Sequence, residues 1–258
     1  MTHILLRDVC VDFPVFTSRS RGLVNTLFLF ARQERKRVES VGMFGYQVHA
    51  LRNISLDLAP GDRVGLVGGN GAGKTTLLRV LSGVYEPVRG SIELEGKVSS
   101  LTDIMQGMDM DASGYDNIVM RGIVLGLSRQ EARDLIPEIE AFSELGEYLH
   151  LPVGTYSTGM MLRLAFAVST AVTPDILLMD EMIGTGDAHF LKKARARLEE
   201  LISRVAILVI ASHNESILKN FCKTALLLKE GRIIHYGTVQ ECLALHKALP
   251  TEAVAERA

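Results

Sequence analysis

One nine-residue stretch, residues 68–76 with the sequence GGNGAGKTT, limits most strongly what this chain can fold into. It fits the pattern G-x-x-x-x-G-K-[ST], in which glycines let backbone N–H groups approach phosphate oxygens. Residues 63–67, which are apolar after Arg63, predict a buried strand before the loop, and residues 76–81 predict a helix whose N-terminus faces the phosphates. This context favours a phosphate-binding loop over an ordinary glycine-rich turn, so we expect the chain to bind a nucleoside triphosphate.

Residues of this loop have distinct expected roles. Lys74 supplies a positive charge for the terminal phosphates, and the hydroxyl of Thr75 is an oxygen ligand for Mg²⁺. The predicted nucleotide contacts in the loop are Gly68, Asn70, Gly71, Ala72, Gly73, Lys74, Thr75 and Thr76.

Composition narrows the class of protein. The chain has 258 residues, 47% hydrophobic and 22% charged, with a net charge of −2, so no basic field is present to attract nucleic acid. Its three cysteines show no metal-ligand or disulfide spacing, which favours a reducing cytoplasm. The N-terminus lacks the form of a signal peptide, and no apolar run reaches the roughly 18–20 residues that span a bilayer. If the protein acts at a membrane, we therefore expect it to do so through a partner protein or by lying on the membrane surface.

The pattern of elements predicts the fold class. Expected strands alternate with expected helices, which indicates an α/β fold with a parallel sheet, flanked by an antiparallel sheet and a helical insertion. Residues 3–13 alternate apolar and polar and predict an edge strand, and residues 90–98 predict a hairpin. The remaining predicted elements are strands at 50–58, 176–180 and 205–211, a hairpin at 224–236, and helices at 128–142, 157–171 and 189–203.

An insertion, residues 14–49, separates the first two predicted strands. Residues 22–32 are apolar at helical spacing, and basic residues flank them at 19–21 and 33–37. Two interpretations stay open: a helix packed on the core, or an amphipathic helix at a membrane interface or against a membrane partner.

Two acidic residues follow a buried strand downstream of the loop. The sequence Ile-Leu-Leu-Met at 176–179 is followed by Asp180, which can hold Mg²⁺, and by Glu181, which is placed to polarise the attacking water. Asp180 and Glu181 are therefore the predicted metal ligand and general base.

Two further positions have a structural and a functional interpretation. His213 follows the strand at 205–211, so it is either a structural histidine or a sensor of the γ-phosphate. Ser157 and Gly159 open a predicted helix, where they either cap the helix or form an anion site with its N–H groups.

Taken together, residues 1–245 resemble the nucleotide-binding subunit of an ABC transporter, a P-loop NTPase with an antiparallel β subdomain and a helical subdomain. The resemblance identifies residues 68–76 as Walker A, 176–181 as Walker B and His213 as the switch histidine. The D-loop corresponds to 184–187, ending in Asp187, and the signature loop to 156–160. The signature departs from the commonest LSGGQ form, because it keeps Ser157 and Gly159 but not the glutamine.

That departure resembles the branch that exports lipopolysaccharide O antigen, capsule and teichoic acid. The signature YSTGM, the D-loop GTGD, the segments at 98–101 and 114–118 and the insertion at 14–49 carry the resemblance. It implies an ATP-binding domain over 1–245, with a helical subdomain at about 103–172 and a tail at 246–258. Some members append a carbohydrate-binding domain, and we expect this chain, which ends at Ala258, to lack one.

Two family elements are matched with alternatives. By its spacing to Asn117, Asp103 is the first candidate for the glutamine-loop residue near the metal, with Gln106 as the alternative. Tyr46 is the first candidate for the aromatic that stacks on adenine, with Phe44 and His49 as alternatives.

The resemblance also implies an assembly. One loop and one signature per chain require a head-to-tail homodimer that encloses ATP and Mg²⁺, on two copies of an integral-membrane permease that carries a lipid-linked glycan. The expected location is the cytoplasmic face of the inner (plasma) membrane, as a peripheral subunit without nucleic acid. The alternatives are an ABC ATPase of a transporter for another substrate and a soluble ABC ATPase.

The general-base assignment yields a first prediction. Glu181→Gln is expected to bind ATP but to hydrolyse it about 10²–10⁴-fold more slowly, because the amide cannot accept the proton of the attacking water. Single-turnover hydrolysis together with nucleotide affinity measures both properties. Hydrolysis near the wild-type rate would reject Glu181 as the base.

Overall fold

The computed structural model describes residues 2–16, 38–41, 45–102, 104–105, 107–180 and 188–249. The chain divides into two compact units, of which the first comprises residues 3–95 and 211–258 and the second comprises residues 96–210. We call them the loop unit and the helical unit. The insertion segments 17–37 and 42–44 and the tail at 250–258 lie outside the described residues.

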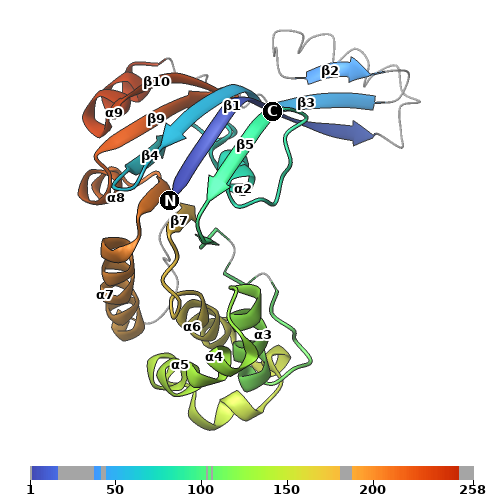
Figure 1. Cartoon of the computed structure of the whole chain (residues 1–258), viewed down its shortest axis with the longest axis vertical. Coiled ribbons are helices and arrows are strands. Elements are labelled where there is room, and N and C mark those ends of the chain that lie inside the picture. The colour runs from blue at the N-terminus through green and yellow to red at the C-terminus, as the bar shows by residue number, and fades with distance from the viewer. Residues whose placement is uncertain are drawn as a thin grey trace, which may run out of the picture. The chain divides into compact units, whose positions relative to one another are not determined.

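The loop unit contains a four-stranded antiparallel sheet with the order β2-β3-β1-β5 (Figure 1). Its strands are β1 (His3–Phe16), β2 (Val38–Val41), β3 (Gly45–Leu58) and β5 (Arg89–Glu95). The edge-strand prediction for residues 3–13 is wrong, because β1 pairs with β3 on one side and β5 on the other. The alternation of apolar and polar residues shows which face of a strand is buried, as for Ile4 and Leu6. It does not show whether a strand is paired on one edge or on both, because the hydrogen bonds between strands lie in the plane of the sheet.

The loop unit also contains the strand that leads to the phosphate loop. Strand β4 (Arg63–Val67) pairs in parallel with β9 (Thr224–Lys229), which forms the predicted hairpin with β10 (Arg232–Thr238). The helices of this unit are α2 (Lys74–Leu81), α8 (Glu215–Phe221) and α9 (Val239–Ala248). The strand and helix predicted around the loop are thus confirmed. Figure 1 shows α9 beside β9 and β10.

The helical unit contains a second set of strands. Its strands are β6 (Val98–Ser100), β7 (Ile176–Asp180) and β8 (Ile207–Ala211), in the order β8-β7-β6. The hairpin predicted over 90–98 is wrong, since β5 pairs with β1 whereas β6 pairs in parallel with β7. The chain changes sheets at Gly96, which has a φ of 115°, and the next N–H, of Lys97, donates to the Asp175 carboxylate at 2.7 Å.

The other regular elements described in the helical unit are helices. Its elements are α3 (Gly114–Val124), α4 (Arg129–Asp134), α5 (Ile136–Ser143), α6 (Thr158–Ser169) and α7 (Ala188–Arg204), with 3-10 turns at Gly146–His150 and Val153–Thr155. The sequence Ser-Arg-Gln-Glu at 128–131 predicts a capping box, and the structure confirms it. The helix predicted over 128–142 breaks at Leu135, because Pro137 has no N–H to continue the hydrogen-bonding pattern of α4.

Cys10, Cys222 and Cys242 are all free and buried, and burial raises the pKa of the Cys222 thiol to about 12. Within the described residues, no helix has both the length and the apolar content needed to cross a bilayer.

A buried amide fixes the entry to α3 and gives a stability prediction. Asn117 is fully buried, accepts from the Asp109 N–H at 2.8 Å, and donates to the carbonyls of Asp109, Ala112 and Ser113. Asn117→Ala is expected to lower the free energy of unfolding by about 3 kcal/mol, because several backbone groups lose their partner.

Denaturant unfolding measures this change, with Gln130→Ala as the control. The Gln130 side chain is exposed and donates to the carboxylate of Asp134, so its loss is expected to change stability by less than about 0.5 kcal/mol. Equal stabilities of the two variants would show that the Asn117 network contributes nothing.

Candidate nucleotide site

The phosphate loop can form only with glycine at two of its positions. Gly68 has a φ of 154°, and a Cβ there would lie 2.5 Å from the carbonyl oxygen of Leu228. Gly73 has a φ of 110°, and its Cβ would lie 3.1 Å from the carbonyl oxygen of Ala50. Both contacts are to backbone atoms that cannot move aside, so these two glycines are required by the packing of the loop itself.

The turn of the β9–β10 hairpin supports the loop from behind. The N–H of Gly231 donates to the carbonyl oxygen of Ala72 at 2.9 Å, and the carbonyl of Gly231 accepts from the Arg52 N–H at 2.7 Å. Inside the loop, the Ala72 N–H donates to the Gly69 carbonyl at 3.1 Å. The sequence predicts the hairpin at 224–236 but not its contact with the loop, since the two segments lie about 160 residues apart.

The loop lysine is held against carbonyl groups of its own loop. Lys74 is 8% exposed, and its Nζ donates to the carbonyls of Gly68 at 2.7 Å and Gly69 at 3.2 Å. Helix α2 begins at this residue, and Gly73 before it has no side chain to cap the first-turn N–H groups. A positive ammonium and a helix N-terminus thus lie together, which is the arrangement that binds phosphate. Thr75 lies exposed in the first turn of the helix.

Among the histidines of this unit, His213 and His246 are relevant to the loop. His213 is exposed and directly follows β8, as predicted, and the next residue, Asn214, caps α8. His246 on α9 was missed. Burial lowers its pKa, and the charges of Lys74 and His213 lower it further. His246 therefore lies near enough to the loop lysine for the two charges to interact, which no pattern in the sequence signals.

The predicted signature residues lie on the surface of the helical unit. Ser157 caps α6 by accepting from the Met160 N–H at 3.3 Å, which confirms the capping interpretation. A Cβ on Gly159 would find no atom closer than the Ser157 hydroxyl at 4.0 Å. The chain's own packing therefore does not require glycine at 159, and the open space leaves the anion-site interpretation of these residues in place.

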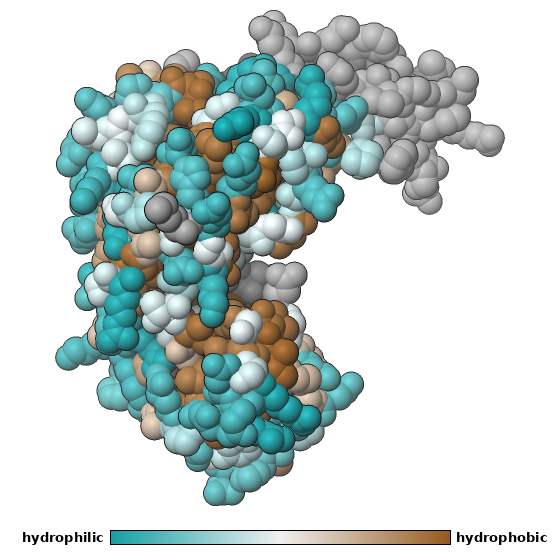
Figure 2. All heavy atoms as spheres, viewed as in Figure 1, coloured by the Kyte–Doolittle hydropathy of each residue, from teal (hydrophilic) through white to brown (hydrophobic). Residues whose placement is uncertain are grey.

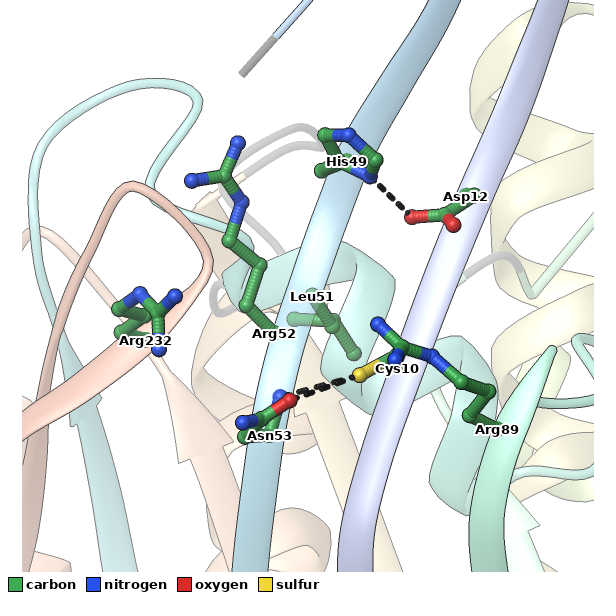
Figure 3. A pocket seen from close by; sticks show the side chains of 8 residues that line it. All are labelled: Cys10, Asp12, His49, Leu51, Arg52, Asn53, Arg89 and Arg232. Carbon is green, nitrogen blue, oxygen red and sulfur yellow. Dashed lines mark hydrogen bonds and ion pairs between the residues drawn. The ribbon is translucent and has the colours of Figure 1, made fainter. Parts of the chain in front are cut away.

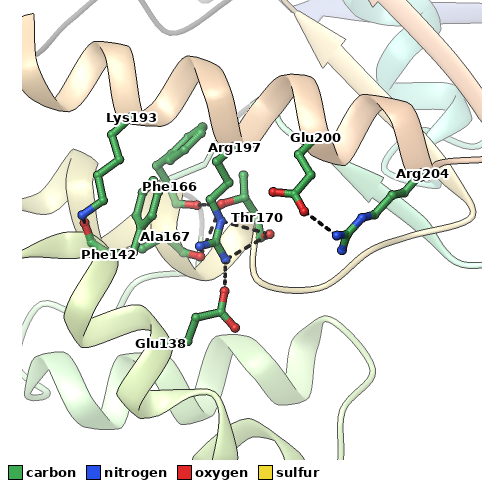
Figure 4. A network of polar contacts seen from close by, with 9 residues as sticks. All are labelled: Glu138, Phe142, Phe166, Ala167, Thr170, Lys193, Arg197, Glu200 and Arg204. Atoms are coloured by element: carbon green, nitrogen blue, oxygen red, sulfur yellow. Dashed lines mark hydrogen bonds and ion pairs between the residues drawn. The ribbon is translucent and has the colours of Figure 1, made fainter.

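Basic side chains of α7 bind the carbonyl ends of the neighbouring helices (Figure 4). Lys193 donates to the carbonyls of Ala141 and Phe142 at the end of α5, at 3.1 and 3.0 Å. Arg197 donates to the carbonyl of Thr170 after α6, at 3.4 Å, and pairs with Glu138. Cations are favourable at helix C-termini, so these contacts fasten α7 to the C-terminal ends of α5 and α6.

Aromatic packing strengthens the same junction. The Arg197 guanidinium lies 4.5 Å from the ring centre of Phe142, and Phe142, Phe166 and Phe190 have ring centres about 6 Å apart. Lys193 also binds Glu144 at 2.7 Å, and this hydrogen bond holds the pKa of the Glu144 carboxyl below its ordinary value.

Of the remaining predicted residues, some belong to the described part of the chain and others lie outside it. Asp180 ends β7 in the helical unit and is half-buried, and Tyr46 of β3 lies half-buried opposite Val15 in the loop unit. His49, the alternative to Tyr46, binds the Asp12 carboxylate through Nδ1 at 2.8 Å. The predicted residues outside the described part of the chain are Phe44, Asp103, Gln106, Glu181 and Asp187.

Comparison with known proteins identifies relatives over most of the chain. Residues 51–184 match the family model described as ABC transporter. The O-antigen export system ATP-binding protein RfbE of Yersinia enterocolitica is 44% identical over 90% of this chain and 97% of its own length. The teichoic acids export ATP-binding protein TagH of Bacillus anthracis is 37% identical over 75% of this chain, which spans 35% of that longer protein.

A solved structure supports the fold. The dimeric structure of a post-hydrolysis state of an ATP-binding cassette, bound to ADP and Pi, matches with a TM-score of 0.65 at 17% identity. The match covers 92% of this chain and 98% of that one. At this identity the likeness shows the fold alone.

The loop geometry predicts opposite results for two neighbouring glycines. Gly68→Ala is expected to weaken nucleotide affinity roughly 100-fold, because a strained, clashing backbone costs about 3 kcal/mol. Gly69→Ala is the matched control. A Cβ at Gly69 meets no atom within 4 Å and its φ is not in the left-handed region, so affinity is expected to stay within about twofold.

Fluorescent-nucleotide titration of both variants measures the affinities, and circular dichroism checks that both are folded. Equal affinities would mean that the contact between Gly68 and Leu228 does not set the shape of the loop.

Proposed function

The chain belongs to the ABC transporter family as an ATP-binding subunit, and we propose that it is the ATP-hydrolysing motor of an exporter of lipid-linked polysaccharide. O antigen is the first candidate cargo, with capsule and teichoic acid as alternatives. The observation that carries the proposal is the 44% identity to an O-antigen export ATP-binding protein over nearly the whole of both chains. The variant signature at 156–160 points to the same branch.

The phosphate loop supplies the chemistry of ATP binding. Lys74 and the N–H groups at the start of α2 would hold the terminal phosphates, as their geometry in the loop supports. The Thr75 hydroxyl and the Asp180 carboxylate offer Mg²⁺ the oxygen ligands that it prefers, and Asp103 is the predicted additional residue near the metal. Mg²⁺ would neutralise phosphate charge, while Glu181 takes the proton of the attacking water and His213 contacts the γ-phosphate.

A second copy of the chain would complete each site. Ser157 and Gly159 lie exposed, and the space around Gly159 is open, as expected of a surface that receives a ligand from outside its own chain. Asp187 in the D-loop is the further predicted contact. ATP would then join the loop of one copy to the signature of the other in a two-fold dimer, and hydrolysis would release it. The solved cassette of the same fold is itself dimeric.

The helical unit offers a surface for a membrane partner. Met120, Ile123 and Val124 of α3 are exposed, Val124 at 82% of its surface, and Figure 2 shows hydrophobic residues gathered over this helix. Exposed apolar patches of this kind mark sites of protein interaction. We infer that an integral-membrane permease docks on the chain at the cytoplasmic face of the membrane and carries the glycan.

Purification from native membranes tests the transport assignment. The tagged chain, solubilised in detergent, is expected to retain a stoichiometric partner of several hydrophobic spans, each about 20 residues long. Disruption of the chain's gene is expected to remove a surface glycan, and analysis of that glycan separates O antigen from capsule and teichoic acid. Recovery only from the soluble fraction, with nucleic acid or ribosomes, would contradict the proposal.

The dimer yields a prediction for Gly159. In the Glu181→Gln background, ATP is expected to convert monomer to dimer on size-exclusion chromatography. Adding Gly159→Asp is expected to abolish the shift, because a carboxylate would face phosphate across the interface. The control, Gln130→Asp, adds the same charge on exposed α4 and is expected to leave the dimer intact. A dimer that survives Gly159→Asp would rule out this role for the signature loop.

A further inference from the structure

A cavity lies in the loop unit, lined by side chains other than those of the phosphate loop (Figure 3). Its volume is about 220 Å³, and its walls come from β1, β3, β5 and the start of β10. We call it the arginine cavity. The residues that line it are Cys10, Asp12, His49, Leu51, Arg52, Asn53, Arg89 and Arg232.

Irregular strand pairing shapes this cavity. The register between β1 and β3 shifts between Val9 and Val11 and again before Asp12, and the register between β1 and β5 shifts between Arg7 and Cys10. Asn53 has a φ of 50°, in the left-handed region. Bulges redirect side chains and are frequent beside binding sites. Here they bring polar side chains of three adjacent strands around one hollow.

The lining carries more positive than negative charge. Three arginines face the cavity, whereas Asp12 is its one carboxylate. Both oxygens of Asp12 are already engaged, Oδ1 with His49 Nδ1 at 2.8 Å and Oδ2 with Gln47 Nε2 at 2.8 Å. The carboxylate therefore fixes the histidine and does not neutralise Arg89 or Arg232, which makes the hollow attractive to anions.

Several donors remain available to a ligand. Within the part of the chain that the structure describes, no hydrogen bond or ion pair engages the side chains of Arg89 and Arg232. Arg89 reaches from β5 across β1 toward Cys10, while Arg232 lies beyond β3 (Figure 3). Cys10 Sγ donates to Asn53 Oδ1 at 3.1 Å, which turns the amide nitrogen of Asn53 away from Cys10. Guanidinium groups bind phosphate in a bidentate manner more readily than any other side chain.

We propose that the arginine cavity binds a small phosphate-bearing anion, at a site separate from the bound nucleotide. The cavity has room for a phosphomonoester or a diphosphate. The guanidinium groups in its lining would balance the negative charge of either anion. Leu51 forms one wall, and its Cδ2 lies 3.0 Å from the position of a Cβ on Gly73 in the phosphate loop. A ligand in the cavity would therefore contact Leu51, which packs directly against that loop.

Calorimetric titration with inorganic pyrophosphate tests the site. The full chain is first saturated with a non-hydrolysable ATP analogue, so that the phosphate loop is filled. We expect one pyrophosphate per chain, and about tenfold or weaker affinity in Arg89→Gln and in Arg232→Gln, because each removes a charge-assisted hydrogen bond. Both arginines are exposed, so the fold is expected to survive, as thermal melting checks.

Arg129→Gln is the matched control, because it removes one exposed arginine of α4 in the helical unit. Its pyrophosphate affinity is expected to equal that of the wild type. The proposal is overturned if the analogue-saturated wild type binds no pyrophosphate, or if both cavity variants bind it as tightly as the control does.

Vesicle flotation distinguishes two sources of the phosphate. If the cavity variants also lose binding to phosphatidylglycerol vesicles, while phosphatidylcholine vesicles bind none of the proteins, the ligand is a lipid headgroup. If vesicle binding is equal in all variants while pyrophosphate affinity falls, the ligand is a soluble phosphate compound. Either result supports the anion site.

Discussion

The close approach of the β9–β10 hairpin to the phosphate loop is the constraint on which the nucleotide site depends. The carbonyl of Leu228 excludes any side chain at Gly68, and the N–H of Gly231 holds the carbonyl of Ala72. Lys74 then folds back onto the loop carbonyls. The β9–β10 hairpin and the N-terminus of α2 are thus fixed around one backbone loop, so the loop is preorganised and phosphate binding requires little further ordering of it.

The helical unit is organised by charge at helix ends. Lys193 and Arg197 of α7 bind the carbonyl ends of α5 and of α6, and Phe142 packs beneath both cations. The predicted D-loop immediately precedes α7, and the predicted signature caps α6. Two segments that would contact the partner copy are therefore carried by helices that are fastened together, which suits a unit that transmits nucleotide binding as a rigid body.

Sequence predicted what depends on local chemistry. The glycine-lysine pattern, the capping box at Ser128 and the apolar strand 176–180 each fix their structure through neighbours along the chain, and all three are confirmed. Strand pairing was less predictable, because the alternation of apolar and polar residues does not show which strands are neighbours in a sheet. The predictions for β1 and for residues 90–98 were both wrong for this reason. Arg89 and Arg232 line the same cavity although about 140 residues separate them, and no pattern in the sequence indicates this.

Burial of the three cysteines has a practical consequence for following this motor in solution. Thiol-reactive probes attack the thiolate, and a thiol whose pKa is about 12, as at Cys222, is almost entirely protonated at neutral pH. Burial also raises the pKa of Cys242, and only 3% of Cys10 is exposed, at the wall of the arginine cavity. A single cysteine introduced on the exposed signature loop would therefore carry a spectroscopic label selectively against the native background. Distance changes during the ATP cycle become measurable without first removing the native cysteines.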